Sequence, residues 1–270
     1  MARLFSFATW NVEHFKNDRD RIQDNIQFVR DSNPDVFAIF EVEGRDVFGA
    51  FVELMPNHNF FITEDLSRME ILVGVSRGFT AFVTQRQRFK SNVPTLRPGA
   101  LVTLVIDNNY YSLLFLHLKS SSDPRSWGLR DDMIHHVRNL KKALDRASGA
   151  PGGANFICIG DLNTMGMNLT YSKKDVSGEE ELKRYLKILK NNGMRLLPKD
   201  VDHTHWGGIG STYPKSNLDH ALASEGLTFK KFGEAEISVR GWPQLPAEQA
   251  QTEWIQKHSD HALLYGEVHS

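Results

Sequence analysis

Acidic and amide side chains follow several apolar runs of this sequence, at the points where the runs end. The first run ends in Asn11, and the second ends in Glu41 within "IFEVE". A later run, "FICIG", is followed at once by Asp161 and Asn163. Apolar runs of this kind are typical of buried strands, and a polar group that is buried without a partner costs free energy. We therefore predict that these side chains serve a site at the strand ends.

Three further segments add similar side chains. The segment "LFLHLKS" contains His117 and Lys119, and "SNLDHALAS" contains Asp219. The segment "HSDHALL" contains Asp260 and His261. Residues at strand ends in layered α/β folds meet along a common edge of the sheets. We therefore expect one cleft that gathers carboxylates, amides, histidines and a lysine.

This set of side chains predicts metal-assisted attack of water on a phosphoester. Carboxylate and amide oxygens suit a hard cation such as Mg²⁺ or Mn²⁺, whereas a zinc site would favour His and Cys at a fixed spacing. Histidines beside carboxylates can move protons or neutralise a negative intermediate. We therefore expect Mg²⁺ or Mn²⁺ as the cofactor of a phosphoester hydrolase.

The composition is that of an ordinary globular protein. The 270 residues are 40% hydrophobic and 24% charged, and the net charge is −1. This charge lacks the strong positive excess that would indicate nucleic-acid binding across the whole chain. The first residues lack the apolar segment of a signal peptide, no run approaches about 18 apolar residues, and Cys158 has no second cysteine to pair with. We therefore expect a cytoplasmic protein without a membrane partner.

Apolar periodicity predicts strands interspersed with helices, which favours a mixed α/β or α+β sandwich. We expect strands at 3–12, 35–44, 59–63, 70–76, 79–85, 100–107, 110–120, 155–160, 217–224, 227–239 and 261–268. We expect helices at 20–33, where Asn33 and Pro34 end the first one, and at 45–55, 126–147, 177–193 and 246–256. The polar pair Asn108 and Asn109 indicates a hairpin turn. The stretch 147–155 is interpreted as a connection within one domain rather than a linker.

The ordered blocks "TWNV", "FEVE", "HLKS", "GDLN", "LDHALAS" and "SDH" resemble the endonuclease/exonuclease/phosphatase superfamily, which includes the deoxyribonuclease I-like metal-dependent phosphodiesterases. The blocks follow the order of that family from Asn11 to His261. The resemblance implies a four-layer sandwich, in which two packed mixed β-sheets are flanked by helices. It also implies that residues 1–270 form a single catalytic domain.

The resemblance further implies a role for each matched residue. At the metal, it places Asn11, Glu41 and Asp260. Asp161 would orient or deprotonate the attacking water, and Asn163 would hydrogen-bond the phosphoryl oxygens in the transition state.

The remaining matched residues would contact the substrate or support those that do. His261 would contact the scissile phosphate, oriented by Asp219, and His117 would be a second catalytic histidine. Lys119 and Arg130 are candidate phosphate contacts that would bind substrate. We interpret the His-x-His of "DHTHW" as a polar loop rather than a metal site.

Taken one at a time, some of these residues could also have a purely structural role. Asp161 and Asn163 also fit a turn, Glu41 alone fits a solvated strand end, and His117 fits a core histidine. We favour the functional interpretation because six blocks occur in order.

Three functions remain open. The expected one is a divalent-metal-dependent phosphodiesterase, an endonuclease or exonuclease that acts on nucleic acid, with DNA favoured over RNA and no obligate protein partner. The alternative is a phosphomonoesterase or a sphingomyelinase-like lipid phosphodiesterase with the same site. A binding module without catalysis is disfavoured, because every expected catalytic position is filled.

Overall fold

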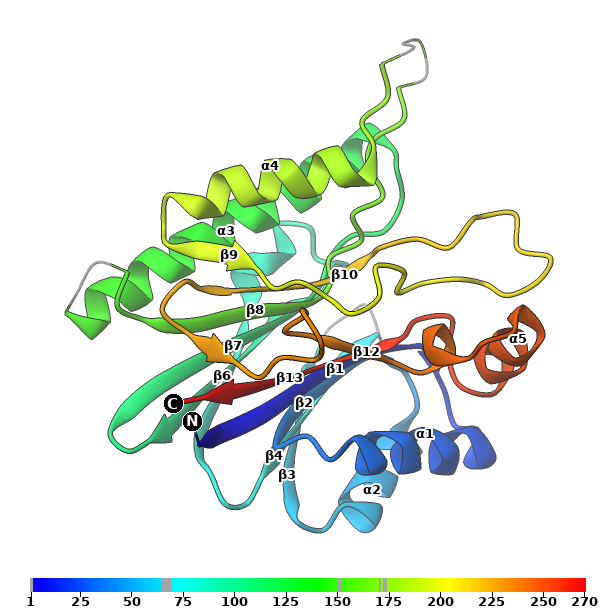
Figure 1. Cartoon of the computed structure of the whole chain (residues 1–270), viewed down its shortest axis with the longest axis horizontal. Helices are drawn as coiled ribbons and strands as arrows, with labels where there is room; N and C mark the ends of the chain where they lie inside the picture. Colours follow the sequence, from blue (N-terminus) through cyan, green and yellow to red (C-terminus); the bar gives the residue numbers. More distant parts are fainter. Residues whose placement is uncertain (1, 65–68, 150–151, 170, 172–173) are drawn as a thin grey trace.

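Two β-sheets packed face to face form the centre of the structure, a computed structural model that describes residues 2–64, 69–149, 152–169, 171 and 174–270. Helices cover the outer face of each sheet (Figure 1). The predicted four-layer sandwich is therefore confirmed. Among the described residues, no helix is both long and apolar enough to cross a membrane.

The first sheet is mixed and contains the strand from which Asn11 projects. Its strands run in the order β11-β13-β1-β2-β4-β3, and β12 also pairs with β13. The pairing is parallel between β1 and β2 and antiparallel elsewhere. The strands are β1 (Arg3–Phe15), β2 (Val36–Val42), β3 (His58–Ile62), β4 (Glu70–Ser76), β11 (Thr228–Phe229), β12 (Ser238–Arg240) and β13 (Leu263–His269).

The second sheet is also mixed and runs in the order β5-β6-β7-β8-β10-β9. Its parallel pair, β7 with β8, is joined by the long helix α3, as a crossover between parallel strands requires. The strands are β5 (Thr80–Arg86), β6 (Gly99–Ile106), β7 (Asn109–His117), β8 (Asn155–Asp161), β9 (Met194–Leu196) and β10 (Asp219–Ser224).

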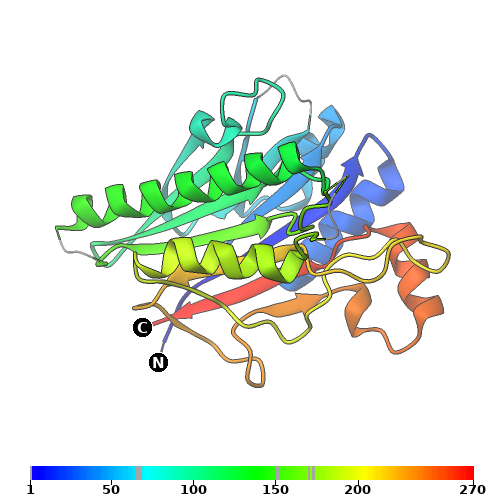
Figure 2. The ribbon, with the colours of Figure 1, turned by 90° about the horizontal axis from the view of Figure 1, so that it is seen from above.

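The helices lie on the two outer faces and beside the site. Figures 1 and 2 show α1 and α2 against the first sheet and α3 and α4 against the second. The α-helices are α1 (Arg19–Ser32), α2 (Arg45–Leu54), α3 (Pro124–Ser148), α4 (Gly178–Lys190) and α5 (Glu248–Lys257). Short 3-10 helices are η1 (Gln87–Lys90) and η2 (Trp242–Gln244).

Local sequence signals account for the helix starts. Asp123 caps α3 by accepting hydrogen bonds from the backbone N–H groups of Arg125 and Ser126, and Pro124 occupies the first turn. Ser177 and Glu180 form a capping box at the start of α4. The apolar face of α3 is buried against the second sheet and includes Met133, Val137 and Leu140. These signals explain why the predicted helices agree with the observed ones to within a few residues.

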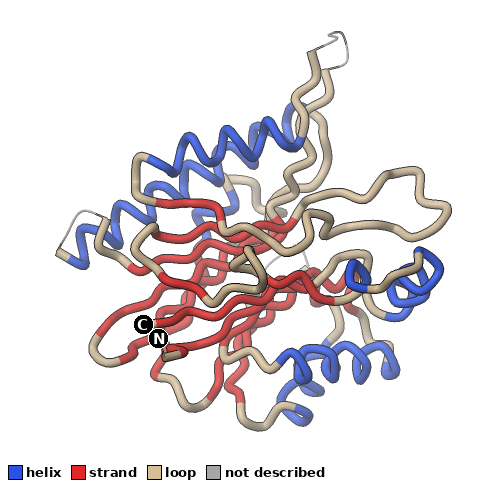
Figure 3. The backbone as a smooth tube through the Cα atoms, in the orientation of Figure 1, coloured by secondary structure: helices blue, strands red, loops and turns tan. Residues whose placement is uncertain are grey.

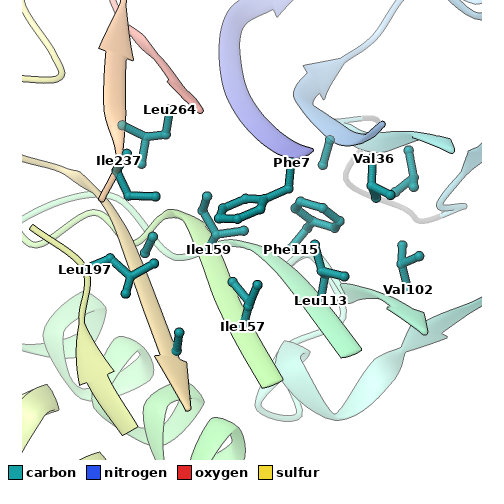
Figure 4. Close-up of a cluster of buried hydrophobic side chains, with 14 of the residues drawn as sticks. Phe7, Val36, Val102, Leu113, Phe115, Ile157, Ile159, Leu197, Ile237 and Leu264 are labelled. Carbon is teal, nitrogen blue, oxygen red and sulfur yellow. The ribbon is translucent and has the colours of Figure 1, made fainter. Parts of the chain in front are cut away.

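Three hydrophobic clusters hold the layers together. Figure 4 shows part of the largest, where Phe7 of β1 lies close to Phe115 of β7 and Ile159 of β8. These three residues are fully buried between the sheets. The second cluster packs α3 and α4 onto the second sheet, and the third packs α1 and α2 onto the first. Burial of these apolar groups is the main stabilising contribution to the fold.

The structure corrects two local predictions. The hairpin turn between β6 and β7 consists of Asp107 and Asn108, both with positive φ, because Ile106 pairs with Asn109. The predicted strand 227–239 is divided into β11 and β12, which pair separately with β13. The short β9 was not predicted. Residues 150–151 of the predicted connection 147–155 lie outside the described residues.

Candidate active site

The strand register of the second sheet brings three predicted site residues together. His117 lies directly opposite Asp161 in the parallel β7–β8 pair, and Asp219 lies opposite Asp161 in the antiparallel β8–β10 pair. In the first sheet, β1 and β2 end on the same side of the sandwich, the end opposite the two chain termini (Figure 3). The two sheets therefore present their polar strand ends to one another.

Asn11 connects the two sheets through its side-chain amide. Its Nδ2 donates to Oε1 of Glu41 at 3.2 Å within the first sheet and to Oδ2 of Asp161 at 3.1 Å in the second. Glu41 also accepts a bond of 2.9 Å from the backbone N–H of His14. The amide therefore holds two carboxylates of different strands at a fixed separation.

Asp161 contacts Asn11, Asn163, His117 and His261 through its carboxylate and is only 1% exposed. Its carboxylate accepts bonds of 3.0 Å from the backbone and the side-chain amide of Asn163. Burial raises its pKa to about 6, although His261 opposes the rise. A carboxylate with a pKa near neutrality suits a general base.

His261 and Asp219 form a buried pair beside Asp161. Nδ1 of His261 lies 2.9 Å from Oδ2 of Asp219, and Nε2 lies 3.8 Å from Oδ2 of Asp161. Burial alone would lower the pKa of His261, but the two carboxylates raise it well above its ordinary value. The ring is therefore a cation that faces the carboxylate at the centre of the site.

His117 differs from His261 in charge. Its Nε2 lies 3.4 Å from Oδ2 of Asp161 and 3.6 Å from Oε1 of Glu41. Burial lowers its pKa well below the ordinary value, and the positive charge of Arg97 adds to this effect. A neutral imidazole beside a cationic one gives the site two histidines with different proton occupancy.

Unusual backbone conformations are concentrated at this site. Glu13, His14, Glu41 and Asn163 all have positive φ, between 29° and 62°. Such conformations cost about 1–3 kcal/mol each for residues other than glycine, and they persist at functional sites. The strand ends are therefore shaped to position the side chains of Glu41 and Asn163.

The carboxylates of Glu13, Glu41 and Asp260 form an acidic part of the site that suits a divalent cation. Burial raises the pKa of Glu13, and the carboxylates of Asp260 and Glu41 raise it further. The carboxylates of this part therefore repel one another, and a bound cation would relieve the repulsion. Together with the amide of Asn11, this oxygen set suits Mg²⁺ or Mn²⁺. An ion held there would polarise a phosphoryl oxygen.

The prediction that Arg130 contacts phosphate is wrong. Arg130 is 0% exposed, and its guanidinium binds both carboxylate oxygens of Glu181 at 2.8 and 3.0 Å. It also donates to the backbone carbonyls of Lys119, Ser121 and Gly166. All of its hydrogen-bonding capacity is used to join α3, α4 and the two loops beside the site. Lys119 is half-buried on one of these loops, and its predicted substrate contact stays a prediction.

We expect Arg130→Met to lower the free energy of unfolding by about 3–5 kcal/mol, because it leaves the buried carboxylate of Glu181 without its cationic partner, with only the hydroxyl of Tyr185 and the backbone N–H of Gly166 still donating to it. Urea unfolding would measure the loss. Arg184→Met is the matched control, because Arg184 pairs with Asp131 at an exposed position and should cost at most about 1 kcal/mol. Equal losses in the two variants would contradict the assignment of Arg130 as a structural residue.

Two residues near the site were missed by the sequence interpretation. His205 of the "DHTHW" segment, interpreted as a polar loop, has its Nε2 3.3 Å from Oδ2 of Asp260. Arg97 lies just before β6, where burial lowers its pKa and the carboxylates of Glu41 and Asp161 oppose this. The His-x-His spacing was a signal for His205. No local pattern marks Arg97.

Among the residues that the structure describes, no carboxylate contacts the guanidinium of Arg97, although this side chain lies near the carboxylates of Glu41 and Asp161. Its Nε is buried and has no hydrogen-bond partner among the described residues. One terminal nitrogen contacts Sδ of Met69 at 3.3 Å. A guanidinium without a carboxylate partner in contact retains donors in a fork that matches phosphate oxygens.

A cavity of 720 Å³ lies next to the site and is bounded by the loops after β7, β8 and β9. Its described lining contains no lysine or arginine, and its exposed walls include Met165 and Tyr213. His205 forms part of the wall, so the cavity adjoins the pair His205–Asp260. A cavity of this size and lining suits an uncharged group that is attached to a phosphate.

This fold and site define a class of protein, and a sequence comparison agrees. The family model described as "Endonuclease/Exonuclease/phosphatase family" matches residues 8–239. The chain therefore belongs to this family of phosphoester hydrolases, as the ordered sequence blocks predicted.

The individual relatives are of several kinds. A match of 179 residues is 25% identical to tyrosyl-DNA phosphodiesterase 2 of Bos taurus and covers 62% of this chain and 44% of that protein. The chain thus spans less than half the length of this curated relative. A truncated Caenorhabditis elegans TDP2 has a TM-score of 0.66 at 17% identity, over 98% of this chain and 97% of that one.

Two further solved structures share the fold. The TDP2 of D. rerio, complexed with a single-strand DNA product, has a TM-score of 0.66 at 14% identity and covers 98% of this chain and 99% of that one. A mannosyl-6-phosphatase of Bacteroides thetaiotaomicron has a TM-score of 0.62 at 12% identity, over 98% and 100% of the two chains. The same scaffold therefore supports proteins described as acting on different phosphoesters.

Proposed function

We propose that residues 1–270 form one catalytic domain, a divalent-metal-dependent phosphodiesterase that hydrolyses nucleic acid, with DNA as the favoured substrate. The observation that carries the proposal is the convergence of Asn11, Glu41 and Asp161 from three strands, joined by hydrogen bonds, with His261, which lies just before β13 and pairs with Asp161 at 3.8 Å. Asn11, Glu41 and Asp260 would hold Mg²⁺ or Mn²⁺, which would polarise the phosphoryl group when bound.

The side chains of the site supply the remaining requirements of the reaction. Asp161, with a pKa of about 6, would take a proton from the attacking water. The amide of Asn163 and the imidazolium of His261 would stabilise the negative charge that develops on the phosphoryl oxygens. Asp219 would keep His261 oriented and protonated through its bond of 2.9 Å.

The cavity beside the site supports a diester carrying a nucleoside. A diester has two substituents on phosphorus, and the 720 Å³ cavity offers space for one of them next to His205. Its exposed Tyr213 provides an aromatic surface of the kind on which bases stack. The names of the TDP2 relatives, which refer to DNA, agree with this choice.

A comparison of substrates tests the proposed function. Purified protein is incubated with Mg²⁺ or Mn²⁺ and plasmid DNA, an oligonucleotide with a 5′-phosphotyrosyl group, p-nitrophenyl phosphate, a hexose 6-phosphate or sphingomyelin. We expect cleavage of one or both DNA substrates that EDTA abolishes. Turnover of the monoesters or of sphingomyelin without DNA cleavage would overturn the proposal in favour of a phosphomonoesterase or a lipid phosphodiesterase.

We expect Arg97→Met to lower kcat/KM for the DNA substrate about tenfold to a hundredfold. The loss corresponds to one charge-assisted hydrogen bond to the phosphate, worth about 1.5–3 kcal/mol. Steady-state kinetics measures the effect, with Arg88→Met as the matched control because Arg88 is exposed on η1. An unchanged kcat/KM in Arg97→Met would show that its guanidinium does not contact substrate.

A further inference from the structure

The guanidinium of Arg21, a residue of α1, makes five hydrogen bonds to backbone carbonyls next to the proposed metal site. Its Nη2 donates to the carbonyls of Val12 at 3.0 Å and Glu13 at 2.9 Å, and its Nη1 donates to that of His14 at 3.3 Å. Both Nε and Nη2 donate to the carbonyl of His258, at 3.1 and 2.7 Å. Arg21 therefore joins the end of β1 to a segment near the other end of the sequence.

The end of β1 needs these partners because its backbone leaves the regular strand pairing. The register of β1 with β2 shifts beyond Asn11, and Glu13 and His14 both have positive φ. A strand that bulges in this way leaves carbonyl groups without partners in the sheet. The guanidinium of Arg21 binds three successive carbonyls of this turn, which we define as residues 12–14. The turn at 12–14 therefore depends on Arg21 for its conformation.

The N–H groups of the turn at 12–14 bind two of the predicted metal ligands. The backbone N–H of Glu13 donates to Oδ1 of Asn11 at 3.1 Å, and that of His14 donates to Oε2 of Glu41 at 2.9 Å. Each of these N–H groups shares a planar peptide unit with the carbonyl of the preceding residue, which the guanidinium binds. A displacement of the carbonyls would therefore displace the two ligand side chains.

The carbonyl of His258 connects the same guanidinium to the third predicted metal ligand, Asp260. Asp260 lies two residues after His258, and the hydroxyl of the intervening Ser259 donates to the carbonyl of Asn11 at 2.7 Å. The loop before Asp260 is thus attached to the end of β1 and to α1 at two adjacent residues. These attachments fix the position of Asp260 relative to Asn11, although the two residues come from opposite ends of the sequence.

The hydrogen bonds of Arg21 hold backbone in place and do not neutralise acids. Within the described part of the chain, its guanidinium donates to carbonyls and to no carboxylate. Burial lowers its pKa, and the carboxylates of Glu13 and Asp18 oppose this effect. An arginine offers five N–H donors in a rigid planar fork, whereas a lysine carries the same charge on three rotating donors. The substitution Arg21→Lys therefore removes the arrangement of donors and keeps the charge.

We propose that Arg21 is a positioning residue of the metal site. Its guanidinium fixes the two backbone segments that orient the predicted ligands Asn11, Glu41 and Asp260. The inference rests on the proposed function, which assigns these three residues to the ion. Groups that hold metal ligands in place from outside the coordination shell commonly contribute about tenfold to a hundredfold to metal affinity. With Arg21 in place, the ligands need little rearrangement when an ion binds.

Binding of Mn²⁺ tests this proposal without a substrate, because the electron paramagnetic resonance signal of free Mn²⁺ falls when the ion binds. We expect Arg21→Lys to raise the Kd for Mn²⁺ about tenfold to a hundredfold. Arg19→Lys is the matched control, since Arg19 is an exposed arginine at the first position of the same helix. It should bind Mn²⁺ with the wild-type Kd. Thermal unfolding without metal checks that all variants are folded.

Ser259→Ala is a second variant, because it removes the neighbouring hydrogen bond to the end of β1 and should also weaken Mn²⁺ binding. A folded Arg21→Lys protein with the wild-type Kd for Mn²⁺ would overturn the proposal and leave Arg21 as a residue that only stabilises the fold. If Arg21→Lys does not fold, an unchanged Kd in Ser259→Ala would overturn the proposal instead. A wild type that binds Mn²⁺ but cleaves no DNA would contradict the proposed function alone.

Discussion

Replacing Asp161 by asparagine should lower kcat for DNA hydrolysis about 10³- to 10⁴-fold, close to the full contribution of a positioned general base. Asparagine has almost the same shape but cannot accept the proton of the attacking water. Burial raises the pKa of Asp161 to about 6, so the carboxylate is basic enough to act and is still ionised near neutral pH. Single-turnover kinetics with saturating Mg²⁺ would measure the effect on the chemical step.

The control for this variant is Asp202→Asn, because Asp202 is an exposed acid outside the site and its replacement should leave kcat unchanged. Thermal unfolding of the Asp161 variant should remain cooperative, since asparagine has almost the same shape and its one side-chain oxygen can still accept from the amides of Asn11 and Asn163. A folded Asp161→Asn protein that keeps a tenth or more of the wild-type kcat would exclude Asp161 as the base.

Replacing His261 by glutamine should lower kcat about 10²- to 10³-fold, the usual loss when one preorganised donor to a developing negative charge is removed. The carboxylates of Asp219 and Asp161 raise the pKa of His261 well above the ordinary value, so the wild-type ring offers a full positive charge. Glutamine retains a hydrogen-bond donor without the charge. The effect is measured as kcat with saturating substrate, and His203→Gln is the exposed control.

The variant Asp219→Asn tests whether Asp219 acts by orienting and charging His261 rather than by contacting the substrate itself. We expect a smaller loss than in His261→Gln, because the imidazole remains in place but loses the carboxylate that keeps it charged. The double variant should be no worse than His261→Gln alone, since residues that act as a unit are not additive. Fully additive losses would show that Asp219 and His261 act independently.

Much of the fold could be predicted because local signals and tertiary structure agree. Alternation and apolar runs identified the central strands, and apolar periodicity identified the helix 126–147 that packs on the second sheet as α3. The division of 227–239 into β11 and β12 could not be predicted, because both pieces pair with the distant β13. The turn at Asp107 and Asn108 depends on pairing register, which a polar pair alone does not determine.

Site residues that follow directly after predicted strands could be identified from the sequence. Residues whose role depends on contacts with distant parts of the chain could not. Asp161 and Glu41 end apolar runs, so their positions at the sheet edge follow from the sequence. Arg130 was misassigned because its partner, Glu181, is 51 residues away on another helix. Arg97 and His205 acquire their surroundings from distant segments; the His-x-His spacing marked His205 without indicating Asp260 as its partner, and no local pattern marks Arg97.

The most direct measurement of the central claim is a single turnover of a DNA phosphodiester with Mg²⁺ in water enriched in ¹⁸O, followed by mass analysis of the phosphate-bearing product. Activation of water by Asp161 predicts that one ¹⁸O atom enters that phosphate in the first turnover. DNA that remains intact, or a product phosphate without the label, would contradict the assignment of these strand-end residues as a hydrolytic centre.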